Sequence, residues 1–86
     1  MKTNLNVKNM VIELITYSAG DPEAFNKIWD AYHRMYILGF ITRAEWDRFY
    51  DKCKGYYWDG DSLYDSENSD KKIADFDAET LVVTIL

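Results

Sequence analysis

The chain has 86 residues, of which 48% are hydrophobic and 16% are aromatic, and this content is too apolar for a disordered protein. Its net charge of −5 is unevenly distributed, because residues 1–54 carry eight bases and seven acids whereas residues 55–86 carry two bases and eight acids. An acidic surface repels nucleic acid and attracts basic partners. We therefore expect no direct nucleic-acid binding. The length predicts a single domain, residues 1–86.

The single cysteine, Cys53, excludes an intramolecular disulfide framework and a cysteine-rich metal site. The first residues lack the pattern of a signal peptide. No uncharged apolar run approaches the roughly 20 residues of a membrane span. We therefore expect a cytoplasmic protein that has no membrane partner.

Three helices are predicted in the first two thirds of the chain. Their expected ranges are about 6–19, 22–38 and 43–54. In the first, apolar residues between Val7 and Ile15 recur at the i, i+3, i+4, i+7 spacing that is typical of an amphipathic helix. The second carries one wide apolar face, and the third continues the same pattern in a shorter segment.

Start signals define the second and third helices. Asp21 supplies an N-cap acceptor, and Pro22 stands at the first helical position. Thr42 and Glu45 have the spacing of a capping box, in which each side chain accepts a hydrogen bond from the other residue's amide. The surrounding segment LGFITRAEW (residues 38–46) resembles the corner of SHOCT-type helical hairpins, short modules that often act in oligomerisation. The resemblance implies a helix–turn–helix corner.

The last third of the chain changes to extended segments. Aromatic residues flank the turn dipeptide Asp59-Gly60, which predicts a short hairpin within residues 56–64. Residues 73–76 and 80–86 are predicted to form two further extended segments, and the second of them is rich in β-branched side chains. The predicted fold class is therefore α+β, with three helices followed by a small antiparallel β element.

The sequence satisfies no known catalytic or metal-binding motif. His33, the only histidine, has no nucleophile at a spacing that would pair with it, and Cys53 lies on the predicted inner side of the third helix. The acids between Asp59 and Asp70 do not match a calcium-binding loop, because neither register places a glycine at position 6. We therefore expect a protein that is not an enzyme and has no cofactor or metal.

An acidic and aromatic surface is predicted in the last third. If residues 73–79 form one strand, Asp75, Asp77 and Glu79 share a face at intervals of about 6.6 Å. This interval is close to every second phosphate of a DNA strand, since successive phosphates are ~3.4 Å apart. Aromatic side chains beside such acids are typical of binding hot spots. The alternative, favoured for each ring taken singly, is a position in the core, with Trp58 packed on the helices. The predicted partner-binding residues are Tyr57, Trp58, Asp59, Asp61, Tyr64, Asp65, Asp75, Asp77 and Glu79.

These residues lead to the hypothesis of a non-enzymatic inhibitor or decoy that binds a basic, nucleic-acid-binding surface of a partner protein, such as a nuclease. Phages and mobile elements use small acidic proteins in this way against restriction or CRISPR nucleases. The main alternative is a structural or regulatory module that self-associates through its helical corner or through the apolar segment 81–86 as a homodimer. A DNA-binding regulator and a surface that only keeps the protein soluble are further alternatives.

Overall fold

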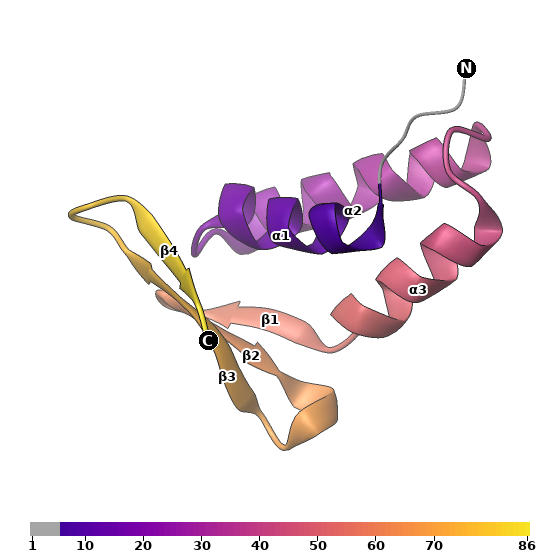
Figure 1. Cartoon of the computed structure of the whole chain (residues 1–86). Helices are drawn as coiled ribbons and strands as arrows, with labels where there is room; N and C mark the ends of the chain where they lie inside the picture. Colours follow the sequence, from indigo (N-terminus) through magenta and orange to yellow (C-terminus); the bar gives the residue numbers. More distant parts are fainter. Residues whose placement is uncertain (1–5) are drawn as a thin grey trace.

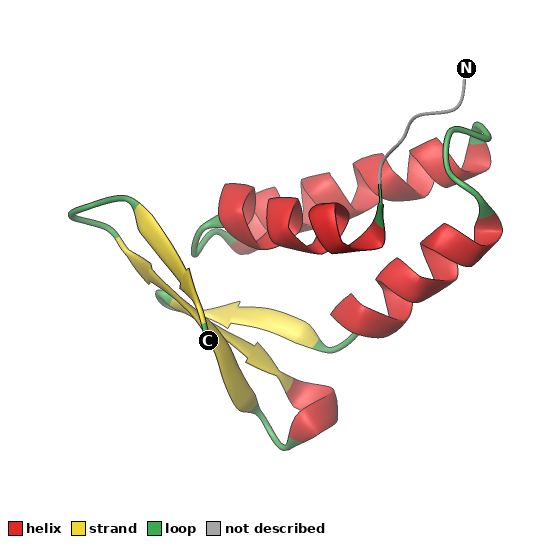
Figure 2. Cartoon of the chain, viewed as in Figure 1, coloured by secondary structure: helices red, strands yellow, loops and turns green. Residues whose placement is uncertain are grey.

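The computed structural model describes residues 6–86 and contains three helices followed by a four-stranded antiparallel sheet (Figure 1, Figure 2). The helices are α1 (Val7–Ser18), α2 (Pro22–Ile37) and α3 (Arg43–Cys53). The strands are β1 (Tyr56–Asp59), β2 (Ser62–Asp65), β3 (Lys71–Asp77) and β4 (Val82–Ile85), with a short 3-10 helix, Ser66–Asn68, between β2 and β3. The α+β class is confirmed, and the helices begin and end within one residue of the predicted positions.

The predicted start signals form the expected helix caps. The Asp21 carboxylate accepts a hydrogen bond from the Glu23 amide at 2.9 Å. Thr42 Oγ1 accepts from the Glu45 amide at 3.1 Å, and Glu45 Oε1 accepts from the Thr42 amide at 2.9 Å. The capping box is therefore complete. These bonds satisfy backbone donors that the first turn of a helix leaves without a partner in the helix.

The sheet is a meander with strand order β1-β2-β3-β4, so β1 and β4 are its two edges. Trp58, Leu63 and Ala74 lie opposite one another on the first three strands and are all buried. They pack with Ile15 of α1. This row therefore defines the inner face of the sheet, which is covered by the helices, and the outer face points away from them (Figure 1).

Two hydrophobic clusters form the core, and α1 contributes to both. The buried members of the helical cluster are Val7, Met10, Leu14, Tyr32, Ile41, Phe49 and Cys53. The buried members of the sheet cluster are Ile15, Trp58, Leu63 and Ala74. Because Leu14 and Ile15 are neighbours on one helix, α1 fixes the sheet relative to α2 and α3.

Cys53 belongs to the helical cluster and is 2% exposed, which confirms the prediction that it is a core residue. Burial raises the pKa of its thiol to about 12. Since the thiolate is the reactive form, we expect the native protein at about pH 8 to react with Ellman's reagent at least roughly 100-fold more slowly than the protein unfolded in guanidinium chloride. Equal rates in the two states would contradict the buried position.

Gly55, between α3 and β1, has a φ of +83° and contacts the loop that follows β2. A Cβ atom there would lie 2.6 Å from Glu67 Cγ and 2.8 Å from Ser66 Oγ. Gly39 is a matched control, because its φ is +85° and a Cβ atom would meet nothing within 4 Å. We expect Gly55→Ala to lower the free energy of unfolding by about 2–3 kcal/mol and Gly39→Ala by about 1 kcal/mol.

Urea unfolding of both glycine variants, followed by circular dichroism, measures this difference. Equal losses would show that the contact between Gly55 and the loop at Ser66 and Glu67 does not restrict the side chain at position 55.

Candidate protein-binding face

The outer face of the sheet carries most of the predicted partner-binding residues. Side chains alternate between the two faces along a strand. Trp58, Leu63 and Ala74 point inward, so their neighbours in the strands point outward, except Ile73, which packs against the inner cluster where the register between β2 and β3 shifts. The predicted residues that lie on the outer face are Tyr57, Asp59, Tyr64, Asp75 and Asp77.

Acidic side chains gather at the end of the sheet where the β1–β2 and β3–β4 turns lie together. Asp59 and Asp75 are both opposite Ser62, so these three side chains form a row across three strands. The Phe76 amide donates a hydrogen bond to the Asp61 carbonyl at 2.7 Å, which holds the β1–β2 turn against β3. We define the acidic face as Asp59, Asp61, Asp75, Asp77 and Glu79.

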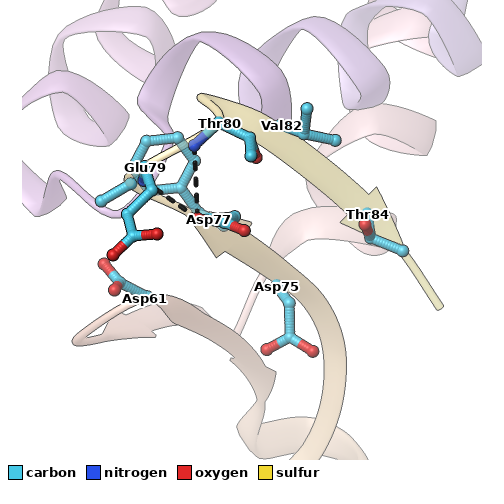
Figure 3. Close-up of a pocket in the computed structure, with 9 residues that line it drawn as sticks. Asp61, Asp75, Asp77, Glu79, Thr80, Val82 and Thr84 are labelled. Carbon is cyan, nitrogen blue, oxygen red and sulfur yellow. Dashed lines mark hydrogen bonds between the residues drawn. The ribbon is translucent and has the colours of Figure 1, made fainter.

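A shallow hollow of about 680 Å³ lies within the acidic face (Figure 3). Its lining includes four carboxylates and side chains from the β3–β4 turn and β4, namely Asp61, Asp75, Asp77, Glu79, Thr80, Val82 and Thr84. The hollow is open to solvent, so the carboxylates that line it can be reached by groups on another molecule. Its position connects the acids to the neighbouring edge strand, β4.

Glu79 reaches this hollow from a turn, whereas the predicted common face of the three acids required one strand through residues 73–79. β3 ends at Asp77. The Asp77 carboxylate accepts hydrogen bonds from the amides of Glu79, at 2.9 Å, and Thr80, at 3.4 Å (Figure 3). These bonds stabilise a turn instead of a further strand residue. The predicted common face therefore holds for Asp75 and Asp77, and Glu79 joins them from the turn.

Lys72 also lies on the outer face and was not among the predicted site residues. Its Nζ is 3.1 Å from Asp75 Oδ1, which also accepts a hydrogen bond from Ser62 Oγ at 2.8 Å. The bond from Ser62 and then Lys72 lower the pKa of Asp75. Asp75 is thus paired within the chain. None of the other four acids has an ion-pair partner within residues 6–86.

The lowered pKa of Asp75 means that the ionised carboxylate stabilises the folded state. A carboxyl group whose pKa is lower in the folded state stabilises the fold above its unfolded pKa of about 3.9, and this contribution is lost as the pH falls through the folded pKa. At neutral pH Asp75 is therefore charged, and Lys72 and Ser62 hold it in a fixed position.

Tyr57 and Tyr64 form the aromatic part of the outer face. Tyr57 lies on β1, two residues before Asp59, and Tyr64 lies opposite it on β2. Their ring centroids are 5.6 Å apart and their planes are inclined by 26°. The Tyr57 hydroxyl donates a hydrogen bond to the Asp70 carboxylate at 2.9 Å, and this bond raises the pKa of Tyr57. Tyr57 is 39% exposed. The pair is therefore both held in place and accessible.

Two of the predicted partner-binding residues have structural roles elsewhere. Trp58 is 7% exposed, and its indole N–H donates a hydrogen bond to Ser18 Oγ at 2.8 Å inside the core. Asp65 accepts a hydrogen bond from the Glu67 amide at 3.0 Å and caps the short 3-10 helix. The burial of Trp58 agrees with the alternative core position and does not fit a role as a partner-binding anchor. We therefore leave both residues out of the candidate face.

Neither a metal cluster nor a membrane-spanning helix is present between residues 6 and 86. Within that range, no three His, Cys, Asp or Glu side chains are grouped so that they could hold a metal ion. No helix in the same part of the chain is long and apolar enough to cross a membrane.

Comparisons of this chain with known protein families, with curated proteins and with solved structures found no match. The corner that joins α2 and α3 has the helix–turn–helix form that the resemblance of residues 38–46 implies. A functional interpretation therefore depends on the geometry and charge of the outer face.

Proposed function

We propose that this protein is a non-enzymatic inhibitor that occupies a basic, nucleic-acid-binding surface of a partner protein. The observation that carries the proposal is the gathering of five carboxylates, against one lysine, around one end of an open sheet face. Anti-restriction and anti-CRISPR proteins of phages and mobile elements are the class of inhibitor that this chemistry fits. The partner would be a nuclease or another protein with a basic cleft.

The spacing of the acids supports a phosphate-like role. Asp75 and Asp77 are two residues apart on β3, which corresponds to about 6.6 Å along the strand. Asp59 lies in the same row as Asp75 but two strands away, or roughly 10 Å. Successive phosphates of a DNA strand are ~3.4 Å apart along the axis. Lysine and arginine side chains that are placed to bind phosphates can therefore meet these carboxylates at similar intervals.

The stacked tyrosines supply the second part of the proposed interface. Tyr57 and Tyr64 present rigid rings beside the acids, and exposed rings of this kind contribute strongly to protein–protein affinity. Charge pairing mainly accelerates and orients the association. The rings would then supply apolar contact that does not depend on salt.

Affinity capture from the lysate of the native host tests the proposal. The test variant combines Asp59→Asn, Asp61→Asn, Asp77→Asn and Glu79→Gln. The matched control combines Asp30→Asn, Asp47→Asn, Asp51→Asn and Glu23→Gln, which changes the charge equally on the helices. We expect the wild type and the control to capture the same basic protein at low salt, and the test variant to lose it. Equal capture by all three proteins would contradict the proposal.

A further inference from the structure

β4 is an edge strand that lacks the usual protection against pairing with another chain. No charged residue and no proline occurs from Thr80 to Leu86, and the register between β3 and β4 is regular. Natural edge strands are normally protected by charges, prolines or bulges. The exposed fractions of the apolar side chains in this segment are 75% for Leu81, 53% for Val82, 50% for Ile85 and 67% for Leu86.

The register also determines which backbone groups point to the open edge. The Leu86 amide donates a hydrogen bond to the Ile73 carbonyl at 2.9 Å, and Thr84 lies opposite Asp75, two residues from this pair. Backbone groups alternate in direction along an antiparallel strand. Thr84 therefore bonds to β3, whereas Val83 and Ile85 direct their N–H and C=O groups to the open edge.

We propose that two copies of this chain form a dimer through antiparallel pairing of β4, with the two-fold axis at Thr84. Val83 of each copy then lies opposite Ile85 of the other, and these two pairs provide four backbone hydrogen bonds. Thr84 lies opposite Thr84 of the second copy, and Val82 lies opposite Leu86. Every opposed pair is apolar with apolar or threonine with threonine, so no like charges face each other.

This two-fold complementarity favours a second copy over a strand from another protein. The helices leave room for it, because Ile85 points to the inner side of the sheet and is still half exposed. β4 is one edge of the sheet, and α3 leads into the strand at the opposite edge, β1 (Figure 1). The interface is small, on the order of 1,000 Å² in total. We therefore expect a dimer with a Kd of about 10–100 µM.

The dimer changes the surface that a partner would meet. Because the two-fold axis is perpendicular to the sheet, the two sheets join into one of eight strands and their outer faces point the same way. Two acidic faces then lie on one side of the assembly. Their joint use in binding rests on the proposed function, whereas the dimer itself does not. Since each copy carries a net charge of −5, added salt strengthens the dimer and weakens binding of a basic partner.

Disulfide cross-linking of Thr84→Cys tests the register. Opposed residues in a non-hydrogen-bonded antiparallel pair have Cα atoms about 4.5 Å apart, which suits a disulfide. Thr80→Cys is the matched control, because Thr80 is exposed in the neighbouring turn and far from the proposed axis. Under mild oxidation we expect Thr84→Cys to form a covalent dimer at least roughly tenfold faster than Thr80→Cys. Equal rates would overturn the proposal.

Sedimentation equilibrium of the full chain tests the dimer itself. The Ile85 amide points to the open edge, so Ile85→Pro removes an intermolecular donor without removing a bond to β3. We expect the wild type to dimerise at about 0.5 mM, more strongly at higher salt, and the proline variant to remain monomeric with an unchanged helical spectrum.

A wild type that is monomeric at this concentration would overturn the proposal. So would a folded proline variant that still dimerises. If the proline variant fails to fold, the cysteine cross-link still decides the question. Failure of the dimer would leave capture of a basic partner by the acidic face unaffected, so the two proposals fail separately.

Discussion

Replacing Phe49 with alanine is expected to lower the free energy of unfolding by about 3–5 kcal/mol. Phe49 is 0% exposed and lies at the centre of the helical cluster. Its ring centroid is 5.0 Å from that of Trp29, 5.2 Å from Tyr32 and 5.7 Å from Trp46. A domain of this length has a total stability of about 4–13 kcal/mol. The loss is therefore a large fraction of the total stability and should clearly lower the urea midpoint.

Tyr50→Ala is the matched control for Phe49→Ala. Tyr50 is the next residue in α3 and also contacts Trp29 and Trp46, but it is 46% exposed. We expect it to cost roughly 1 kcal/mol, because nearly half of the Tyr50 side chain stays exposed to water in the folded state. Urea titration followed by tryptophan fluorescence measures both values. Similar losses in the two variants would contradict the central position of Phe49.

Neutralising the acidic face is expected to weaken the affinity for the captured partner about 100-fold, which corresponds to about 2.7 kcal/mol of binding free energy. The test variant combines Asp59→Asn, Asp61→Asn, Asp77→Asn and Glu79→Gln. The four acids have no ion-pair partner within residues 6–86, so their charges are available to a basic surface. Asparagine at position 77 can still accept from the Glu79 and Thr80 amides. The fold should therefore remain intact.

Titration calorimetry at two salt concentrations measures this effect. The wild type should lose affinity as salt increases, and the test variant should be weaker and less sensitive to salt. The control variant with four neutralised acids on the helices should bind within about threefold of the wild type, since net charge changes equally but the acidic face is intact. If the two variants bound equally, the overall charge of the chain, and not this face, would determine affinity.

The helical part of the fold could be predicted because its signals are local. Asp21 and Pro22 start α2, and Thr42 and Glu45 start α3 through hydrogen bonds within one turn. The hairpin at Asp59 also follows from residues that are adjacent in sequence. Such contacts depend little on the rest of the molecule.

The surface was harder to predict, because it depends on contacts between distant residues. Whether Trp58 points inward or outward is set by α1, through the hydrogen bond to Ser18 that lies forty positions away in sequence. The same limit applies to Lys72, whose ion pair with Asp75 depends on the fold of β3. The turn that ends β3 did have a local signal in the sequence. Asp77 is a residue type whose carboxylate often accepts hydrogen bonds from the amides two and three residues later, as it does here from Glu79 and Thr80.

Displacement of nucleic acid from the captured partner is the most direct test of the proposed function. Fluorescence anisotropy would follow a labelled oligonucleotide that is bound to the partner while this protein is added. We expect the wild type and the helical control variant to displace the oligonucleotide from the partner at about one equivalent of added protein. The acidic-face variant should displace little of it. A partner that binds the wild-type protein and retains its nucleic acid would contradict the proposed inhibitor.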